Sequence, residues 1–423
     1  MKRYLVGGAI RDELLALPVV ERDWVVVGAT PERMLAAGFR PVGKDFPVFL
    51  HPQTGEEHAL ARTERKSGPG YHGFVFHAGP EVTIEDDLSR RDLTVNAIAR
   101  DDDTGELIDP YGGVADLRAR LLRHVAPAFA EDPVRVLRVA RFAARFAPLG
   151  FAVAPQTLAL MGAIVTAGEV DHLVPERVWK ETERALSGDG RAPAGYRPSV
   201  FFRTLRACGA LARIMPELDA LFGVPQPVQY HPEIDAGDHV MRCIDVAQDL
   251  GFALPVRVAA LLHDLGKAAT PRQQWPSHKL HDRRGVPLVK GFCERLRVPR
   301  AYRELAVVVA REHLHVHRAG ELRAGTLLAL LQRLRAFQRG DFFEQALNAC
   351  LCDARGRLGC EHCDYPPVPY LRQAAAVAAQ VQARQVMGEG VSGAQVGSAL
   401  RRARAQRLAA WSLARRGHAA GTE

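Results

Sequence analysis

Two carboxylates stand two residues apart, at Glu21 and Asp23, beside the apolar run Trp24 to Val27. Residues i and i+2 share one face of a strand, so this run predicts a strand that presents both carboxylates together. Such a pair suits hard cations such as Mg²⁺, and two of these ions can activate an attacking hydroxyl and stabilise the oxygen that leaves a phosphate. The alternative is a solvated acidic pair in a loop.

A glycine turn precedes these carboxylates. Tyr4 to Val6 predict a strand, Gly7 and Gly8 a tight turn, and Ala9 to Leu15 a helix. Unpaired amides at a helix start attract anions, and Arg11, one turn into the helix, can hold phosphate oxygens with its guanidinium. An ordinary strand-to-helix turn with a surface arginine is the alternative.

Histidine and aspartate are adjacent at His263 and Asp264, near the end of a predicted helix. Both can ligate one divalent ion when distant helices add further ligands, and the ion makes its bound water nucleophilic near neutral pH. The candidate companions are His239, His281 or His278, His313 and Asp353. Taken singly, a buried histidine is usually structural, and we expect His315 and His317 to lie in a surface turn.

The segment Ala128 to Phe146 predicts a helix with Arg135, Arg138 and Arg141 at intervals of three, and with Asp132 three residues before the first. Steps of three residues follow one side of a helix. Without other information, this pattern indicates a charged helix face.

Strand signals are confined to the first part of the chain. Phe39 to Ala61 alternates apolar segments with turns, which predicts further strands of a mixed sheet. Ala61 to Phe74 combines charge with glycines and a proline, which predicts a mobile loop. The turn Ile108 to Gly113 closes this part, and beyond it we expect no more strands.

Helical patterns follow. Residues 150 to 222 predict helices with short loops, interrupted by an exposed insertion rich in Gly and Pro, Ser187 to Pro198. Residues 365 to 423 open with prolines and continue as helix rich in Ala, Gln and Arg. The end of this segment is either an RNA-contacting or a merely solvated basic helix.

Composition narrows the class of protein. The 423 residues suggest several domains, and 47% apolar residues suffice for ordinary cores. A formal charge of +8 suits a polyanionic partner, although codon bias can equally produce an excess of arginine. Because we see neither a signal peptide nor an apolar run long enough to span a bilayer, we expect a cytoplasmic protein without a membrane partner.

Seven cysteines, an odd number in a long chain, are not typical of a secreted disulfide framework. Four of them, Cys350, Cys352, Cys360 and Cys363, form a CxC and a CxxC pair. A zinc site is one interpretation, but the first pair lacks the usual ligand spacing.

Several motifs together resemble one family. They are GGxxRD at Gly7 to Asp12 with the acidic strand after it, RRDxTxNA at Arg90 to Ala97, EDxxR at Glu131 to Arg135, and HDxGK at His263 to Lys267. The set resembles the polymerase-beta-like nucleotidyltransferases of class II, most closely the bacterial CCA-adding tRNA nucleotidyltransferases with an HD phosphohydrolase domain. The match runs through most of the chain.

The resemblance implies an α+β fold class for the N-terminal part, a nucleotidyltransferase head on a polymerase-beta-like mixed sheet. A mostly α-helical neck, body and HD domain would follow. The implied division is a catalytic head over 1–113, a neck and body with the nucleotide-reading helix and tRNA contacts over 114–225, an HD domain over 226–355, and a helical tail over 356–423.

For the head, the resemblance implies that Glu21 and Asp23 are catalytic and bind Mg²⁺, and that Gly8, Arg11 and Arg91 bind the triphosphate of ATP or CTP. The first metal carboxylate of the family is normally Asp. Glu21 departs from that pattern, and its extra methylene moves the carboxylate by roughly one bond length.

The resemblance also implies that Asp132 and Arg135 read the Watson–Crick edge of the incoming base in place of a template strand, while Arg138 and Arg141 bind the nucleotide. A mismatched edge would leave buried polar groups unpaired, which makes such reading selective.

Supporting roles follow from the same resemblance. Asp92 and Asn96 would hold the local structure, and Arg90 would be solvated. The residues expected to brace the nucleotide-reading helix are Glu176, Arg177 and Glu181.

For the HD domain, the resemblance implies that His263 and Asp264 are catalytic. The metal ligands would be His239, His263, Asp264, His281, His313 and Asp353, with a divalent metal that in the family is often Ni²⁺.

The implied function is template-independent addition of C, C and A to the tRNA 3′ end from CTP and ATP, with release of diphosphate. The HD domain would hydrolyse phosphomonoesters and 2′,3′-cyclic phosphates. The partners would be tRNA, ATP and CTP, and the protein a monomer or homodimer. Three alternatives stay open: a poly(A) polymerase with the same head chemistry, an HD phosphohydrolase whose impaired head only binds RNA, and an RNA-binding protein without activity.

Overall fold

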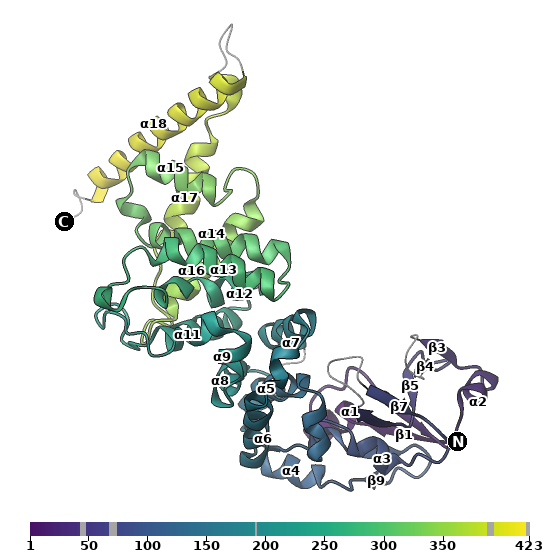
Figure 1. The fold of residues 1–423 in the computed structure, drawn as a ribbon. Coiled ribbons are helices and arrows are strands. Elements are labelled where there is room, and N and C mark those ends of the chain that lie inside the picture. The colour runs from purple at the N-terminus through teal and green to yellow at the C-terminus, as the bar shows by residue number, and fades with distance from the viewer. Residues whose placement is uncertain (43–47, 67–73, 191–192, 387–392, 420–423) are drawn as a thin grey trace. The chain divides into compact units, whose positions relative to one another are not determined.

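The computed structural model describes residues 1–42, 48–66, 74–190, 193–386 and 393–419 (Figure 1). The chain forms two compact units, Met1–Ile214 and Met215–Glu423. The first unit combines a mixed sheet with helices, and the elements of the second are helical. The predicted fold class, an α+β head followed by a mostly helical remainder, is confirmed.

A seven-stranded sheet in the order β3-β4-β5-β2-β1-β8-β9 is the frame of the first unit. Its strands are β1 (Lys2–Val6), β2 (Asp23–Val27), β3 (Arg40–Val42), β4 (Val48–Leu50), β5 (Glu57–Leu60), β8 (Ala99–Asp101) and β9 (Leu107–Ile108). The first strand, β1, is antiparallel to both neighbours, β2 and β8, whereas β2 and β5 are parallel. The strands expected between Phe39 and Ala61 are therefore present as β3, β4 and β5.

Apolar side chains cover both faces of this sheet. Neighbouring residues of a strand point to opposite faces, so Val25 and Val26 of β2 enter different cores. Val25 packs in a cluster with Ile84 of α3 (Ile84–Ser89), and Val26 packs in a cluster with Met34 of α2 (Pro31–Ala36). Burial on both faces fixes the register of β2 and thereby the position of Asp23 at its first residue.

The strand, turn, helix and strand predicted for the first 28 residues are confirmed, with α1 (Gly8–Leu14) between β1 and β2. One detail is wrong. Glu21 lies in the segment before β2, so only Asp23 of the two carboxylates belongs to the strand. Pairing of Asp23 with Val6 places it beside the glycine turn.

Two other sequence predictions need correction. The loop expected from Ala61 to Phe74 begins as strand β6 (Thr63–Lys66), which pairs with β7 (Phe74–His77), while residues 67–73 lie outside the described part. Beyond Gly113, where no strands were expected, β10 (Leu121–Leu122) and β11 (Ala152–Val153) form a short parallel pair.

The helices of the first unit follow the sheet. They are α4 (Gly113–Ala119), α5 (Val134–Phe146), α6 (Pro155–Thr166), α7 (Pro175–Ser187), α8 (Ser199–Ala207) and α9 (Ala210–Ile214). The helix predicted from Ala128 starts later, at Val134, after a 3₁₀ turn over Pro127–Glu131. Pro133 lacks an N–H and favours a helix start, so Asp132 lies just outside α5.

The insertion from Ser187 to Pro198 is not simply an exposed loop. Tyr196 is 1% exposed, and its hydroxyl donates a hydrogen bond to the carbonyl of Ala185 in α7. A tyrosine ring buries much apolar surface when its hydroxyl finds a partner, which explains why this residue turns inward.

The second unit is a helical bundle with a helical tail. Its helices are α10 (Pro216–Asp219), α11 (Ala236–Asp249), α12 (Leu254–Leu262), α13 (His281–Arg295), α14 (Arg300–His317), α15 (Ala324–Arg333), α16 (Gly340–Arg355), α17 (Pro367–Ala379) and α18 (Gly393–Ala419). The central helix, α12, packs against α11, α14 and α16. The predicted C-terminal helices are confirmed, and α18 packs against α15 and α17 (Figure 1). None of the helices within the described residues has the length and apolar character needed to cross a membrane.

Candidate functional site

The turn between β1 and α1 is the starting point of the first site. Gly7 has φ 70° and ψ −120°, a conformation essentially limited to glycine. Its amide donates to the carbonyl of Ile98 at 3.0 Å, and a Cβ here would lie 2.7 Å from Nη1 of Arg91. The turn therefore holds Arg91 against the start of α1.

We expect Gly7→Ala to destabilise the first unit by about 1–3 kcal/mol, because alanine strains this backbone conformation. The added methyl group would also displace Arg91. Thermal unfolding measures the loss. The control is Gly55→Ala, since Gly55 has φ 71° but a methyl group added there would meet no atom within 4 Å. Equal losses for both variants would contradict a role for the Arg91 contact.

Arg11 is buried at 4% exposure and is already held by protein groups. Its Nε donates to Oδ1 of Asp12 at 2.9 Å, and its Nη1 donates to Oδ1 of Asn96. Burial lowers the pKa of Arg11 to about 10 although Asp12 opposes this, so the side chain stays cationic at neutral pH. The second oxygen of Asp12 accepts from Arg145 of α5 at 2.9 Å. These contacts connect the glycine turn to α5.

Asp92 and Asn96 hold the local structure, as predicted. Oδ1 of Asp92 accepts from the side-chain amide of Asn96 at 2.9 Å, and Oδ2 accepts from Nε of Arg138 at 2.8 Å. Burial alone would raise the pKa of Asp92, but Arg138 and Asn96 hold it well below its usual range. Arg90, expected to be solvated, instead pairs with the buried Asp87 at 2.5 Å.

Helix α7 braces α5 and the segment just before it through two ion pairs. Arg141 of α5 contacts Glu181 at 2.6 Å, and Arg177 contacts Oδ2 of Asp132 at 3.0 Å. These are the bracing contacts predicted for Glu181 and Arg177, while Glu176 is exposed. Bidentate arginine–carboxylate geometry fixes orientation as well as adding energy, so Arg177 orients the carboxylate at the start of α5.

Arg135 lies beside Asp132 but donates to backbone carbonyls. Its Nη1 donates to Ala128 at 3.1 Å, and its Nη2 donates to Arg90 at 2.6 Å. Asp132 in turn accepts from the amide of Val134 at 3.1 Å. Both side chains line the same pocket, and the base-reading role expected for them stays a prediction.

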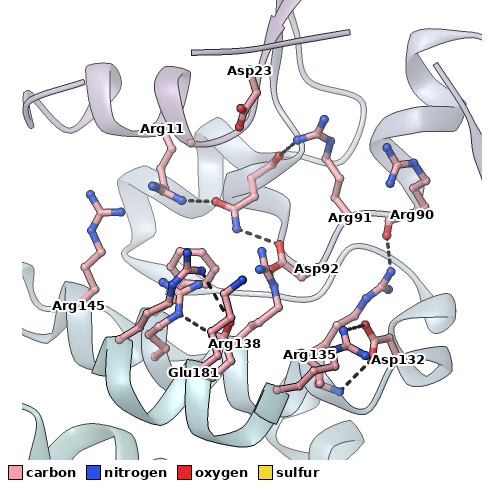
Figure 2. Close-up of a pocket in the computed structure, with 18 of the residues that line it drawn as sticks. Arg11, Asp23, Arg90, Arg91, Asp92, Asp132, Arg135, Arg138, Arg145 and Glu181 are labelled. Atoms are coloured by element: carbon pink, nitrogen blue, oxygen red, sulfur yellow. Dashed lines mark hydrogen bonds and ion pairs between the residues drawn. The ribbon is translucent and has the colours of Figure 1, made fainter. Parts of the chain in front are cut away.

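These side chains surround one pocket of about 1080 Å³, which is large enough for a nucleoside triphosphate. In Figure 2, Arg11 and Asp23 lie on one side and Arg135, Arg138 and Glu181 on the other. Ten basic and five acidic side chains line the pocket, which makes it strongly attractive to an anion. Of the residues predicted for the head, it brings together Gly8, Arg11, Glu21, Asp23, Arg91, Asp132, Arg135, Arg138 and Arg141.

Glu21 and Asp23 are exposed carboxylates at this pocket. A hard divalent ion is commonly held by one or two carboxylates and by substrate phosphates. The donor set therefore fits Mg²⁺ bound together with a triphosphate.

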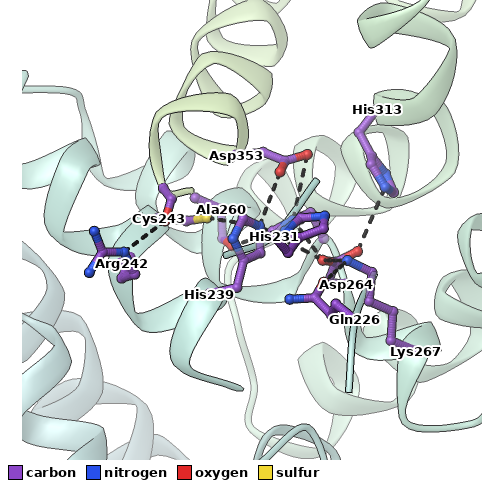
Figure 3. A network of polar contacts seen from close by, with 12 residues as sticks. Gln226, His231, His239, Arg242, Cys243, Ala260, Asp264, Lys267, His313 and Asp353 are labelled. Carbon is purple, nitrogen blue, oxygen red and sulfur yellow. Dashed lines mark hydrogen bonds and ion pairs between the residues drawn. The ribbon is translucent and has the colours of Figure 1, made fainter. Parts of the chain in front are cut away.

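A second candidate site lies in the other unit, where the side chains of His239, Asp264, His313 and Asp353 come together (Figure 3). His263 and Asp264 follow the buried helix α12, with Nε2 of His263 3.2 Å from Oδ2 of Asp264. His239 of α11 lies 3.1 Å from Oδ1 of Asp353, which belongs to α16. His281 of α13 lies 3.3 Å from Oδ1 of Asp264.

His313 of α14 completes this HD cluster, 3.7 Å from Oδ1 of Asp264. The predicted companions are therefore together, and of the two alternatives it is His281 that joins them. His278 instead contacts the carbonyl of Pro225 at 2.7 Å. The expectation for His317 is wrong, because it lies on α14 and contacts Asp353 at 2.6 Å and the hydroxyl of Tyr365 at 2.8 Å. His315 is on the same helix, half exposed, beside Glu312.

The HD cluster is electrostatically prepared for a cation. Burial alone would raise the pKa of Asp264, but His263 and Lys267 hold it well below its usual range. Burial would lower the pKa of His263, but Asp264 and Asp353 raise it to about 9. Oδ1 of Asp264 and Nε2 of His263 are buried without a hydrogen bond in the described part of the chain, whereas Oδ2 of Asp264 pairs with Lys267 at 2.5 Å. Imidazoles and carboxylates with unsatisfied buried atoms fit a divalent transition metal.

Sequence analysis missed two residues at this cluster. Oε1 of Glu233 lies 2.9 Å from Nδ1 of His239 and thus orients that imidazole. Sγ of Cys243 lies 3.4 Å from Nε2 of His239. The i,i+4 spacing of His239 and Cys243 could have indicated that both belong to one site, because such residues share a helix face. For Glu233 the proximity in sequence to His239 was the only hint.

The zinc interpretation of the cysteine quartet finds no support in the structure. Cys350 and Cys352 are buried in α16, whereas Cys360 is half-buried and Cys363 exposed. Among the described residues, the groups placed to hold a metal include none of these four. Burial raises the pKa of the Cys350 thiol well above its usual value, which disfavours a thiolate there.

Family models match three parts of the chain: a poly(A) polymerase head domain at residues 3–123, a probable RNA and SrmB-binding site of polymerase A at 150–222, and an HD domain at 236–339. This order of parts defines a nucleotidyltransferase joined to an HD phosphohydrolase. A multifunctional CCA protein of Alkalilimnicola ehrlichii is 62% identical over 410 residues, 97% of either chain. One of Thioalkalivibrio sulfidiphilus is 60% identical over 408 residues, 96% of this chain and 98% of its own. The chain belongs to the family of multifunctional CCA proteins.

A solved structure, the Thermotoga maritima CCA-adding enzyme complexed with tRNA_CCA, has a similar fold. It matches with a TM-score of 0.60 at 18% identity, over 97% of this chain and 87% of its own. The two relatives that are 62% and 60% identical confirm the family expected from the motifs.

Proposed function

We propose that the first unit adds C, C and A to the 3′ end of tRNA from CTP and ATP, releasing diphosphate, and that the HD cluster hydrolyses phosphoesters. The observation that carries the first activity is the basic pocket that has Glu21 and Asp23 at one side and Asp132 with Arg135 at the other. Nucleotide chemistry and base reading can therefore take place in a single cavity. Names of the relatives, multifunctional CCA proteins, support the same activity.

Glu21 and Asp23 would hold Mg²⁺. The ion, when bound, activates the 3′ hydroxyl of the RNA and stabilises charge on the phosphates. Gly8, at the start of α1, offers its backbone, and Arg11 and Arg91 offer positive charge to the triphosphate. Because Asp12 and Asn96 already fix the guanidinium of Arg11, this charge is preorganised.

Asp132 and Arg135 would read the base, one as an acceptor and the other as a donor. Arg138 and Arg141 would secure the nucleotide from α5, while their contacts with Asp92 and Glu181 keep this helix in place. For base pairing, Arg135 must exchange its bonds to backbone carbonyls for bonds to the base. The free-energy cost of such an exchange is small when every donor and acceptor finds a new partner.

We expect Arg177→Gln to raise the KM for CTP and ATP roughly 5- to 20-fold and to increase incorporation of wrong nucleotides, because Asp132 loses its orienting partner. Steady-state incorporation into tRNA that lacks its 3′ CCA measures both effects. Arg213→Gln is a matched control, since this arginine pairs with Asp171 on the surface of the same unit. An unchanged KM in the Arg177 variant would contradict the orienting role.

We expect Glu21→Asp to change the incorporation rate by less than roughly threefold. Glu21 is exposed and lies in the segment before β2, so we expect this segment to adjust to a carboxylate of either length. The measurement is single-turnover incorporation at saturating Mg²⁺. A gain above tenfold would show that the native metal site is compromised and would favour the alternative of an impaired head.

In the HD part, His263 and Asp264 would be catalytic, with His239, His281, His313 and Asp353 as the other ligands. The metal supplies a nucleophilic water near neutral pH. Phosphomonoesters and 2′,3′-cyclic phosphates are the proposed substrates, and Ni²⁺ is the proposed metal. Lys267, 2.5 Å from Oδ2 of Asp264, brings positive charge to the place where a phosphate would bind.

The proposed division of labour assigns nucleotide transfer to residues 1–113, base reading and tRNA contacts to 114–225, hydrolysis to 226–355, and further RNA contacts to the tail, 356–423. tRNA, CTP and ATP are the proposed partners, in the bacterial cytoplasm, with the protein a monomer or homodimer.

One assay tests this function. The full chain is incubated with tRNA that lacks its 3′ CCA and with each nucleotide alone and in pairs. The expected product is two C residues with CTP and one further A when ATP is added. Long A tails would instead identify a poly(A) polymerase, the class named in the family description that matches residues 3–123. If no nucleotide is incorporated, only the proposed phosphohydrolase activity would remain.

A further inference from the structure

Phe142 is the one aromatic side chain among the described residues that line the basic pocket of the first unit. It belongs to α5 and is 5% exposed. Three guanidinium groups approach this ring. The distance from the ring centroid to Cζ is 4.5 Å for Arg141, 5.2 Å for Arg11 and 5.7 Å for Arg138. An aromatic ring attracts a cation that lies within about 6 Å of its centroid, so Phe142 attracts three cations at once.

These cations come from two elements of the unit. Arg138 and Phe142 are four residues apart on α5 and therefore share a face of that helix. Arg11 comes from α1, across the pocket from Arg138 (Figure 2). The ring of Phe142 thus connects the charge beside the glycine turn with the charges of α5.

Packing fixes the ring of Phe142. Phe146, four residues further along α5, is 0% exposed and stacks on Phe142, with the centroids 6.0 Å apart and an angle of 2° between the ring planes. Cζ of Arg11 also lies 5.0 Å from the centroid of Phe146, so this guanidinium group borders both rings. A ring that is held by a buried neighbour can in turn hold the cations beside it.

Carboxylates hold the same three arginines at a second point. Each arginine donates a hydrogen bond from Nε to a carboxylate, with the acceptors Asp12 for Arg11, Asp92 for Arg138 and Glu181 for Arg141. The ring adds a contact of a different kind. Each guanidinium group is therefore constrained both by an ion pair and by an aromatic neighbour.

A ring suits this position better than a charged or an aliphatic side chain. Guanidinium groups this close repel one another, yet the pocket must stay positive to attract an anion. A further carboxylate would hold the arginines but would also repel phosphates. An aliphatic side chain carries no charge, but it offers cations no attraction. A phenyl ring attracts cations and has no net charge, so it meets both requirements.

We propose that Phe142 is a positioning residue for the nucleotide. Its ring holds the guanidinium groups of Arg11, Arg138 and Arg141 in the arrangement that receives the triphosphate. This inference rests on the proposed nucleotide transfer and deepens it, because it names the group that keeps the phosphate-binding charges in place. Since Phe142 acts through the arginines, its loss weakens binding of the nucleotide more than it slows the transfer step.

Phe142→Leu tests this division. We expect the KM for CTP and ATP to rise roughly 5- to 20-fold and kcat to change less than roughly threefold, because leucine keeps the apolar contact but not the attraction for cations. Steady-state incorporation into tRNA that lacks its 3′ CCA measures both constants. The matched control is Phe151→Leu, which should leave both constants unchanged. Phe151 is 8% exposed and lies 5.4 Å from Phe146, and within the described residues no guanidinium group borders its ring.

Fluorinated rings separate the attraction for cations from the shape of the side chain. Phenylalanine with one, two or three ring fluorines is introduced at position 142 by nonsense suppression. Each fluorine withdraws electrons from the ring face and changes the volume little. We expect the dissociation constant for CTP, measured by calorimetry on the full chain without tRNA, to rise with every fluorine and to reach roughly 3- to 10-fold with three. The trifluorinated residue at position 151 should leave it unchanged.

Inorganic triphosphate is the second probe, because it has no base. Its affinity should fall across the fluorinated series as the affinity for CTP does. A loss for CTP alone would mean that the ring contacts the base, and it would overturn the proposal. The same holds for equal dissociation constants across the series, whether or not Phe142→Leu folds, and for an unchanged KM in a folded Phe142→Leu protein. Thermal unfolding shows which variants are folded.

The outcomes separate this inference from the function it rests on. CTP binding that weakens with each fluorine, in a protein that transfers no nucleotide to tRNA, would support the role of the ring and refute the proposed transfer. Transfer by a protein whose affinity for CTP is insensitive to fluorine would support the proposed transfer and refute the role of the ring.

Discussion

Asp23→Asn is expected to lower nucleotide incorporation into tRNA by at least roughly 10³-fold, because the change removes a metal-binding charge where the phosphates react. Asparagine has the same size, and Asp23 is an exposed residue at the start of β2, outside both cores of the head. The loss should therefore appear in the rate and not in stability. Single-turnover incorporation of labelled CTP, with saturating tRNA and Mg²⁺, measures it.

Asp103→Asn is the matched control. Asp103 is exposed in the same unit, in the turn after β8, and does not line the pocket. It should keep full incorporation. Hydrolysis of phosphoesters should be equal in both variants, since the HD cluster lies in the other unit. If Asp23→Asn retains more than a tenth of the incorporation rate, the proposed metal role of this carboxylate is wrong.

Asp264→Asn is expected to reduce phosphoester hydrolysis by at least roughly 10²-fold and to leave CCA addition unchanged. Asp264 is 1% exposed and is approached by four imidazoles and Lys267. The variant loses a buried carboxylate whose two oxygens lie 3.2 Å from Nε2 of His263 and 3.3 Å from Nε2 of His281. Hydrolysis of a 2′,3′-cyclic phosphate and incorporation of CTP are measured on the same preparation.

Loss of a buried charge can also destabilise the second unit, because Lys267 loses its carboxylate partner and keeps only Gln226 among the described residues. Such losses reach about 3–5 kcal/mol. Thermal unfolding of the variant shows whether hydrolysis is lost through lower stability or through the missing carboxylate itself. Asp249→Asn, at the exposed end of α11, is the control for an aspartate change in that unit. Chelation of the wild type should reproduce the loss of hydrolysis without any substitution. Unchanged hydrolysis in a folded Asp264 variant would exclude the HD cluster as the active site.

Local sequence patterns were sufficient for the elements that carry the motifs. The glycine turn before α1 and the apolar strand β2 follow from short-range propensities and were predicted almost to the residue. For α5 the end at Phe146 was predicted, but the start, expected at Ala128, lies at Val134. Glu21 was misplaced because the alternation of residues does not say where a strand begins. In the structure the pairing of β2 with β1 begins at Asp23, which lies opposite Val6. Helix α5 starts late because Pro133 sets its first turn.

Long-range partners were beyond these patterns. The resemblance implied that Arg177 braces the nucleotide-reading helix, but nothing near Asp132 in sequence indicates that Asp132 is its partner. Nothing near His317 indicates its contact with Asp353. Such pairs depend on how helices pack, which short motifs do not encode. The burial of Tyr196 is a similar case. This residue lies in a segment rich in Gly and Pro, which predicts an exposed loop, yet its ring is buried.

The position of β1 in the sheet has a consequence for the synthesis of this protein. β1 leaves the ribosome long before one of its two hydrogen-bonded neighbours, β8, which begins only at Ala99. The contact between Asp12 and Arg145 forms later still, because Arg145 lies farther along the chain than β8. Contacts so far apart in sequence slow folding and leave strand edges open to wrong partners. The nascent head therefore passes through a period in which β1 lacks one of its two neighbours, and we expect it to need protection by chaperones until α5 has been made.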